Sequence, residues 1–444
     1  MGLQLVTDTY QKDTGPSTPT YPVRYPFEPP VDLGEPLTFA GEPPWEAFKA
    51  MREQAPVMWT SLDSKALSGF WSLTRYDDVR AVSLSTDTWS SQAGGIMMAY
   101  AEGPRQHPKL HSASLNTMIC LDGAHHMQLR REHMQFVRPN YVAELKRKVD
   151  AKVAALLDAA EAAGPRLNWV EHVSSQLPLF TLCEMLGVPE ADRPRIRQWM
   201  DMLEHANYVL GTQDPSTVDP QLVMTFLQEV EAMFAYGREV LLDRRKRPTD
   251  DLLSAIANVE VDGERLHDEY LDGSWLLIII AGNDTTRNSL SGGLRLLGRH
   301  PDQHAKVLAD HSLIPNMVHE IVRMVSPVMY MRRTALQDTE IRGQKIAAGE
   351  KAVMWYGAAN RDPEVFENPD LFDVTRDNAS KHIAFGMGAH VCMGQRIANM
   401  QLNAAYEQIF ERFPKIRWTG KQTVLPNNFT HSIAELEVDL YGAD

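Results

Sequence analysis

One short segment combines glycine, histidine and cysteine at a spacing that suits chemistry: Phe385-Gly386-Met387-Gly388-Ala389-His390-Val391-Cys392-Met393-Gly394. Glycine tolerates positive φ angles and lets the backbone approach a flat partner closely. The pattern predicts that a helix begins near Cys392, where free amides and the helix dipole stabilise a thiolate. Because the thiolate is the form of cysteine that binds metals, Cys392 is a candidate metal ligand.

Two other interpretations of this segment are possible. A buried cysteine in a glycine-rich turn needs no function, and this would be the better interpretation of an isolated cysteine. Here several specified residue types coincide within one short segment, which argues against chance. A zinc site fits less well, because His390 and Cys392 are too close for the usual ligand pair and the sequence has no Cys-x-x-Cys.

The segment resembles the haem-binding loop of the cytochrome P450 family, whose members are haem-thiolate monooxygenases. The resemblance implies that Cys392 is the iron ligand and that Phe385, Gly386 and Gly394 contact haem b. It also implies a mainly α fold with minor β structure, built as a single triangular helical domain with small β-sheets. Other segments are similar to the bacterial branch that contains alkane and fatty-acid terminal hydroxylases and monoterpene hydroxylases.

A second segment, Ala281-Gly282-Asn283-Asp284-Thr285-Thr286, follows an apolar run. An aspartate there is costly unless it is paired or hydrated, and the Thr285 hydroxyl can bond back to the carbonyl of Ala281 and loosen the helix. A capped helix end would explain the segment if it stood alone. The pair Asp284-Thr285 is similar to the acid–alcohol pair of the family, which implies that Thr285 supports oxygen activation and that Asp284 relays protons. The family also places Ala281 beside the haem.

The segment Glu320-Ile321-Val322-Arg323 has an acid and a base three positions apart on a predicted helix, which by itself is a common surface pair. Its place before Cys392 resembles the Glu-x-x-Arg signature of the family. The segment around Arg376 resembles the one that supplies a third member. By this resemblance Glu320, Arg323 and Arg376 are structural residues.

The resemblance also places candidate partners for the haem carboxylates at His126, Arg130, Arg333 and His390. Arginine suits carboxylates because it is always charged and can form two parallel hydrogen bonds. A solvated charge is the alternative for each one. The segment Asp122-Gly123-Ala124-His125-His126 departs from the family pattern, which leaves His125 as an alternative. The spacing to Arg130 favours His126.

Helices must position these residues, since helical periodicity dominates the chain and strands are few. The predicted helices span residues 45–55, 121–138, 144–163, 168–187, 192–210, 220–247, 266–298 and 391–413, with two more within 300–326. Two short strands are expected at 57–60 and 69–74, and further strands and loops between 327 and 389. We expect residues 1–44 to form a proline-rich N-terminal extension and residues 45–444 to form one haem-thiolate monooxygenase domain.

The composition limits the possible partners and compartment. The 444 residues carry a net charge of −14, which argues against nucleic acid as a partner. The three cysteines do not make a disulfide framework, and no signal peptide or membrane span is visible. We therefore expect a soluble, cytoplasmic protein, and we expect a monomer.

No flavin or nicotinamide motif occurs, so electrons must come from other proteins. The resemblance implies a ferredoxin and its NAD(P)H-dependent reductase, which could dock at Arg130, Arg131 and Arg396; scattered solvated charges are the alternative. An apolar substrate is expected. The candidate lining residues are Ile96, Met97, Met98, Tyr100, Leu203, Val209, Ile280, Ala281, Thr285, Val328, Met329, Met331 and Phe429.

The leading hypothesis is an O2-dependent monooxygenase for an alkane, fatty acid, terpene or steroid-like compound. A peroxide-driven peroxygenase and a non-catalytic haem sensor or carrier are the alternatives. Neither alternative requires an acid–alcohol pair, so Asp284 and Thr285 favour the monooxygenase.

Overall fold

Proline and glycine mark the ends of many elements in the computed structural model. The structure describes residues 16–62, 69–98, 107–206, 209, 216, 218–261 and 263–442. Proline lies in the first turn of the helices that begin at residues 108, 139, 193, 220, 301 and 314, where its missing N–H is harmless. Gly187, in the left-handed region, ends the helix α6 (Gln176–Leu186). The predicted helix over 144–163 therefore begins earlier than expected, at Pro139, and the predicted helix over 121–138 is α-helical only over 123–133 and ends in a 3-10 turn over 134–137.

Helices make up most of the described chain. They are α1 (Trp45–Gln54), α2 (Tyr76–Leu84), α3 (Pro108–Leu115), α4 (Gly123–His133), α5 (Pro139–Ala163), α6 (Gln176–Leu186), α7 (Arg193–Glu204), α9 (Pro220–Lys246), α10 (Leu252–Asn258), α11 (Asp268–Ala281), α12 (Asp284–Arg299), α13 (Pro301–Ala309), α14 (Ile314–Val325), α15 (Tyr356–Ala359) and α16 (Gln395–Arg412). The strands are β1 (Val57–Thr60), β2 (Phe70–Leu73), β3 (Trp89–Ser90), β4 (Arg166–Asn168), β5 (Glu260–Val261), β6 (Glu264–Arg265), β7 (Tyr330–Ala335), β8 (Thr339–Ile341), β9 (Gln344–Ile346), β10 (Lys351–Trp355), β11 (Arg417–Val424) and β12 (Ile433–Asp439).

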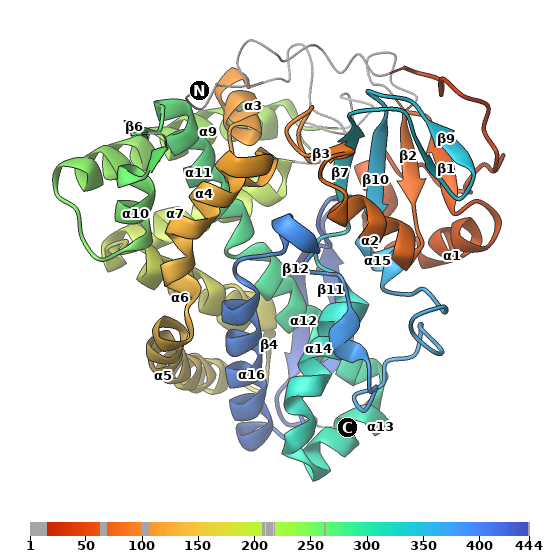
Figure 1. Cartoon of the computed structure of the whole chain (residues 1–444). Helices are drawn as coiled ribbons and strands as arrows, with labels where there is room; N and C mark the ends of the chain where they lie inside the picture. Colours follow the sequence, from red (N-terminus) through yellow and green to blue (C-terminus); the bar gives the residue numbers. More distant parts are fainter. Residues whose placement is uncertain are drawn as a thin grey trace.

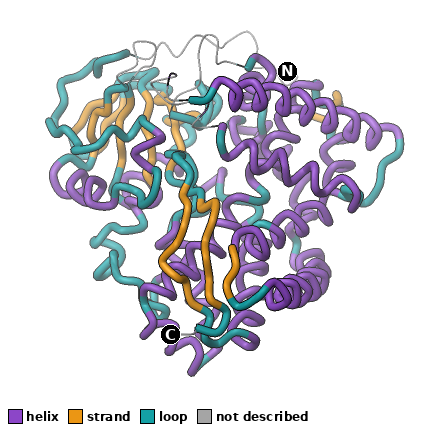
Figure 2. The backbone as a smooth tube through the Cα atoms, turned by 180° about the vertical axis from the view of Figure 1, so that it is seen from behind, coloured by secondary structure: helices purple, strands orange, loops and turns teal. Residues whose placement is uncertain are grey.

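These elements form a triangular molecule in which helices make up two corners and the five-stranded sheet lies at the third (Figure 1). The sheet has the order β1-β2-β10-β7-β3, with β2 and β10 parallel and the other pairs antiparallel. Seen from behind, the three-stranded sheet β11-β12-β4 runs through the middle of the molecule (Figure 2). The architecture confirms the predicted mainly α fold with small sheets.

The part of the N-terminal segment that the structure describes packs against the five-stranded sheet and the two-stranded sheet β8-β9. The amide of Thr20 donates to Glu350 at 2.7 Å, and the amide of Arg24 donates to Gln344 at 2.6 Å. Leu33 and Phe39 are buried in the same apolar cluster as Trp355. Residues from 16 onward therefore share a core with the residues that follow position 44.

The predicted helix over 266–298 is wrong as a single element, because α11 ends at Ala281 and α12 begins at Asp284. The Thr285 hydroxyl donates to the Ala281 carbonyl at 3.4 Å across this break. A hydroxyl that bonds back to the preceding turn competes with the backbone ladder, which explains why the apolar run does not continue as one helix. The break lies in the middle of the molecule (Figure 1).

The helix α16 is held against α12 by one close contact. The Tyr406 hydroxyl donates to the Leu290 carbonyl at 3.0 Å, and it occupies the space that a Cβ at residue 293 would need, which explains the glycine there. The contact fixes the position of α16 relative to α12. The predicted helix start near Cys392 is slightly early, because α16 begins at Gln395 and Gly394 is its N-cap.

Candidate active site: a cysteine at a helix N-terminus beside four basic side chains

The loop before α16 holds Cys392 by its backbone. The amide of Cys392 donates to the Phe385 carbonyl at 2.8 Å, so the loop closes on itself. Gly386 has a φ of +70°, and a Cβ there would meet no neighbouring atom closer than 3.6 Å. The protein leaves room for a Cβ at residue 386, so it is the positive φ angle that favours glycine there.

The sulfur of Cys392 is accessible and yet surrounded by protein on most sides. Burial raises the pKa of its thiol, while the amides of Gly394 and Gln395 and the charge of Arg130 lower it. These are the features of a sulfur that becomes a thiolate when a cation binds it. By contrast, burial raises the pKa of Cys120 and of Cys183 to about 11, so neither is a candidate ligand.

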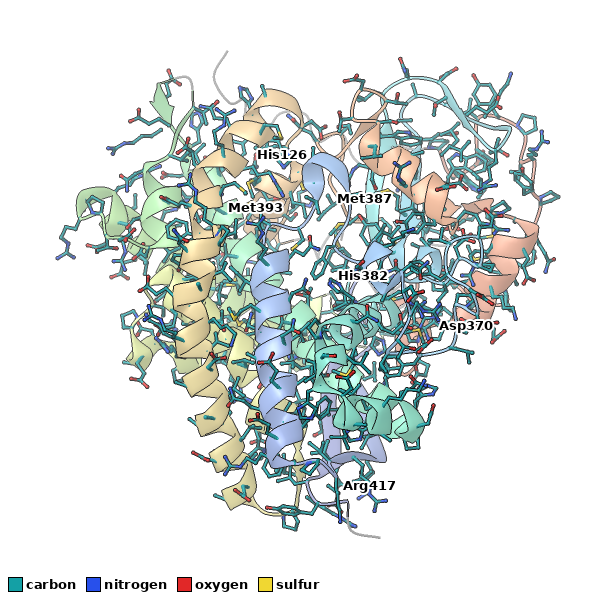
Figure 3. The ribbon with its side chains drawn as sticks, turned by 60° about the horizontal axis from the view of Figure 1, so that its bottom comes forward. His126, Asp370, His382, Met387, Met393 and Arg417 are labelled. Carbon is teal, nitrogen blue, oxygen red and sulfur yellow. The ribbon has the colours of Figure 1, made fainter. Side chains whose placement is uncertain are left out.

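Four basic side chains converge beside this loop from three parts of the chain. The rings of His126 on α4 and His390 on the loop stack with centroids 4.1 Å apart. Arg130 on α4 donates to the Val391 carbonyl at 2.5 Å. Arg333 on β7 is close enough for its charge to lower the pKa of both histidines. Figure 3 shows His126 and Met393 where α4 meets the N-terminal end of α16.

The protonation of this group follows from burial. Burial is the main reason why the pKa of His126 falls to about 4, and the pKa of His390 is also lowered mainly by burial. Both rings are therefore neutral near neutral pH and act as N–H donors, while Arg130 and Arg333 supply the positive charge. The buried Nδ1 of His390 has no hydrogen-bond partner in the described structure, so it is free to bind an added acceptor. Such a set of donors fits carboxylate groups.

One residue that holds this site was missed by the sequence analysis. Asp122 is the N-cap of α4 and accepts hydrogen bonds from the hydroxyl of Ser90 and from the amides of Ser91 and Gln92. Its carboxylate also lies 3.7 Å from Nε2 of His390. A cap signal could not have revealed this role, because the Asp122 carboxylate binds residues 90–92 and His390 and makes no cap hydrogen bond to α4.

Asp284 lies at the first turn of α12 and is buried. Its removal from water raises its pKa to about 8, Asn283 opposes this with a 3.2 Å hydrogen bond, and the charge of Asp201 raises the pKa further. Asp284 is therefore largely protonated at neutral pH and can donate a proton. Thr285 is partly exposed next to it, and Ala281 is exposed.

Glu320, Arg323 and Arg376, which we predicted to be structural residues, meet in one buried cluster. Arg323 binds both oxygens of Glu320, at 2.7 and 2.8 Å, and Arg376 binds Glu320 at 3.1 Å. Both guanidinium groups also bind backbone carbonyls of residues 360–371. This cluster ties α14 to the segment that leads to the cysteine loop.

The candidate lining residues fall into two groups. Met97, Ile280, Ala281, Thr285, Val328, Met331 and Phe429 are at least partly exposed, whereas Ile96, Met98, Leu203, Val209 and Met329 are buried. Leu203 and Val209 lie in the apolar cluster between α7, α9 and α11, and Met98 and Met329 lie in the cluster around Trp355. Tyr100 lies outside the described residues. The assignment of all of these to a substrate site stays a prediction.

The family model described as Cytochrome P450 matches residues 116–434, which span the cysteine loop, the four basic side chains and the Asp284 turn. The chain belongs to the cytochrome P450 family. The methyl-branched lipid omega-hydroxylase of Mycobacterium tuberculosis (strain ATCC 25618 / H37Rv) is 35% identical over 400 residues, with 88% of this chain and 90% of that protein covered. The linalool 8-monooxygenase of Pseudomonas putida is 32% identical over 414 residues, with 92% and 98% covered.

A solved structure agrees with this placement. The cytochrome P450 from Mycobacterium marinum in complex with pseudoionone has a TM-score of 0.82 and 31% identity, covering 93% of this chain and 99% of that one. The resemblance to bacterial hydroxylases is confirmed, and the protein is a P450 monooxygenase that works with a haem iron, O2 and electrons derived from NAD(P)H through redox partners. In the described part of the chain, no helix has both the length and the hydropathy of a membrane span.

Proposed function

We propose that this P450 hydroxylates an apolar small molecule such as an alkane, a fatty acid, a terpene or a steroid-like compound. The electrons would come from a ferredoxin and its reductase in the cytoplasm, and the cofactor would be haem b. The observation that carries the haem assignment is the position of Cys392, whose sulfur lies at the N-terminus of α16 beside two arginines and two neutral histidines. In this arrangement Cys392 would bind the iron and His126, Arg130, Arg333 and His390 would bind the carboxylates.

The overall reaction converts the substrate and O2, with two electrons and two protons, into an alcohol and water. Bound haem supplies the redox chemistry of this reaction. The side chains of the protein supply binding and protons. Asp284 is largely protonated at neutral pH, so its carboxyl group can donate a proton and be reprotonated from the solvent side. The Thr285 hydroxyl, which donates to the Ala281 carbonyl, can accept a proton from Asp284 and pass on its own.

The apolar substrate class is supported by apolar side chains that the sequence analysis assigned to the substrate site and that are at least partly exposed in the structure. Ile280 and Ala281 end α11, and the partly exposed Val328, Met331 and Phe429 come from β7 and the segments beside it and before β12. Methionine side chains adapt to ligands of different shape, which suits an apolar site. The relatives named above act on lipids and on linalool, and by likeness we propose the same kind of substrate here.

The test is the spectrum of the dithionite-reduced carbon monoxide complex. The wild-type protein should give the strongly red-shifted Soret band of a thiolate-ligated haem. Cys392→Ser should lose this band, and the matched control Cys183→Ser should keep it, since Cys183 is buried in the helical cluster. A Soret band like that of haemoglobin in the wild-type protein would contradict the assignment of Cys392.

The substrate class is tested separately on the oxidised protein. Octane, dodecanoic acid, linalool and cholesterol would be titrated in turn, and the shift of the haem from low to high spin would be recorded. We expect saturable shifts with at least one of them and NAD(P)H-dependent hydroxylation of the same compound with a surrogate ferredoxin and reductase. Efficient turnover with hydrogen peroxide alone would instead favour the peroxygenase, and binding without turnover would favour a sensor or carrier.

A further inference from the structure

The side chain of Asn428 joins three segments that are far apart in the sequence, and the function proposed so far gives it no role. Its Nδ2 atom donates to the carbonyls of Leu33 at 3.3 Å and of Gly34 at 3.0 Å, and it lies 3.7 Å from the sulfur of Met98. Asn428 is only 3% exposed. Because breaking the hydrogen bonds of a buried amide is costly, these contacts fix the segment of Leu33 and Gly34 in place.

This distant segment belongs to the N-terminal strap, by which we mean residues 16–44. The strap follows the corner of the five-stranded sheet as far as α1 (Figure 1). Near its end, Glu42 forms ion pairs with two arginines of α12, with Arg295 at 3.3 Å and with Arg299 at 2.8 Å. The strap is therefore anchored on α12 as well as on the two sheets described above.

The strap packs on side chains that we assign to the substrate site. Leu33 and Phe39 are buried in one apolar cluster with Met98 and Met329, and the partly buried Phe429 packs against this cluster. Three of these side chains, Met98, Met329 and Phe429, are predicted lining residues, and each comes from a different segment. The strap thus lies behind one side of the predicted site.

The three lining segments are tied to one another. The amide of Met329 donates to the carbonyl of Phe429 at 2.8 Å, and the amide of Met98 donates to the hydroxyl of Tyr330 at 3.4 Å. The rings of Tyr330 and Phe429 lie edge to face with their centroids 5.3 Å apart. A displacement of one segment would therefore move the other two.

A neighbouring amide holds the loop of Phe429 from another side. Nδ2 of Asn427 donates to the carbonyl of Glu204, at the end of α7, at 3.3 Å. Its Oδ1 atom accepts hydrogen bonds from the amides of Phe429 and Thr430, at 2.9 and 3.0 Å. The two asparagines thus hold this loop between α7 and the strap, so the position of Phe429 depends on both contacts.

We propose that the N-terminal strap sets the shape of the substrate site, and that Asn428 is the positioning residue that couples the strap to Phe429 and Met98. This inference rests on the proposed function, because it takes these two side chains as part of the site. While Asn428 is bound to the strap, both side chains keep fixed positions and disfavour bulky ligands. When the contact is lost, this wall yields, and bulky ligands gain affinity relative to slender ones.

The test compares two imidazoles that bind the haem iron whatever the natural substrate is. 1-Dodecylimidazole is slender, clotrimazole carries three aryl rings, and the shift of the Soret band of the haem-loaded, full-length protein gives both Kd values. Asn428→Ala should change the ratio of the two Kd values by about fivefold in favour of clotrimazole, as expected from the loss of one buried hydrogen bond. Glu42→Gln releases the anchor on α12 and should change the ratio in the same direction.

Two matched controls separate this effect from general loosening. Asn316→Ala removes an amide that likewise donates to two backbone carbonyls of a distant segment, at 2.9 and 3.1 Å. It should lower the stability to urea about as much as Asn428→Ala does and leave the Kd ratio unchanged. Glu46→Gln changes an exposed acid close to Glu42 and should behave as wild type.

Hydrogen exchange of the haem-loaded, ligand-free protein is a second measurement. In Asn428→Ala, the amides of the strap and those of residues 96–98 and 427–430 should all exchange faster than in wild type, because the three segments lose a shared contact. In Asn316→Ala these segments should exchange as in wild type.

An unchanged Kd ratio in Asn428→Ala, or an equal change in Asn316→Ala, would overturn the inference, since either result describes general loosening. Faster exchange in the strap without a change at residues 427–430 would also overturn it, because the strap would then not be coupled to the loop. If Asn428→Ala does not fold, the Kd ratio of Glu42→Gln decides. Failure of the proposed function is distinguishable, since it appears as the absence of a spin shift with all four compounds in wild type.

Discussion

The guanidinium of Arg130 on α4 donates a 2.5 Å hydrogen bond to the carbonyl of Val391, the residue directly before Cys392. The same side chain therefore fixes the backbone of the cysteine loop and places a positive charge near the sulfur. The contact connects two segments that lie 261 residues apart in sequence.

Replacing Arg130 should weaken haem binding. Arg130→Gln removes the charge that lowers the pKa of Cys392, and it shortens the reach to the Val391 carbonyl. We expect a lower ratio of haem to protein after purification and a larger share of the carbon monoxide complex without the red-shifted band. Arg130→Lys keeps the charge and should lose less. Full haem content with an unchanged spectrum in Arg130→Gln would refute this role.

Thr285→Ala should uncouple oxygen consumption from hydroxylation. The variant lacks the Thr285 hydroxyl, which donates to the Ala281 carbonyl. Because this hydroxyl is the proposed proton carrier, protons should reach the bound oxygen less effectively. The expected result is more hydrogen peroxide and less alcohol for each NAD(P)H consumed, measured in one assay. Thr285→Ser keeps the hydroxyl and is the control. Equal coupling in Thr285→Ala and wild type would speak against this assignment.

Asp284→Asn should change the dependence of stability on pH. Because the pKa of Asp284 is raised from 3.8 to about 8, the folded protein binds this proton more tightly than the unfolded chain. Between these two values the free energy of unfolding therefore falls as pH rises. Asparagine has no such proton, so the Tm of the variant should rise relative to wild type when the pH is raised from about 5 to about 8. A difference in Tm that stays constant over this range would contradict the raised pKa.

Glu320→Ala should destabilise the fold strongly. The substitution leaves Arg323, with a fully buried side chain, and Arg376 without their carboxylate, and an unpaired buried charge costs about 3–5 kcal/mol. Urea unfolding of the haem-loaded protein measures this loss. The control is Asp150→Asn, which breaks the exposed pair with Lys146 and should cost no more than about 0.5 kcal/mol. Similar losses in both variants would show that the buried cluster contributes no more than a surface pair.

The exposed Arg131 and Arg396 test the proposed docking of an electron donor. Arg131 is on α4 and Arg396 is at the start of α16, where it donates to the Val137 carbonyl at 3.4 Å. Changing both to glutamine should raise the KM for a surrogate ferredoxin and reduce its dependence on salt, without altering substrate spin shifts. The control is Arg417→Gln, since Arg417 lies at the far end of the molecule from Met393 (Figure 3). An equal rise in KM in the control would argue against a defined docking site.

Residues close together in sequence made the chemistry predictable. The cysteine loop, the Asp284-Thr285 pair and the Glu320–Arg323 pair are local patterns, so their resemblance to the motifs of the cytochrome P450 family could be recognised in the sequence, and this resemblance implied a haem-thiolate enzyme with a mainly α fold. The first helix and the first two strands also follow from local periodicity, and the structure has them within one or two residues of the predicted bounds. Where one segment contains both the ligand and the glycines that shape its loop, no distant contact is needed to recognise it.

Only the tertiary structure decided how distant residues combine. The loosening of the helix by the Thr285 hydroxyl was predicted and is confirmed, but its extent was not, because the structure has a full break between α11 and α12 where the apolar periodicity predicted one helix. The role of Asp122 was missed, since it depends on a partner in another element. The same holds for the pKa of Asp284: the sequence places a carboxyl group after an apolar run, but its burial and the nearby charge of Asp201 arise only in the folded chain.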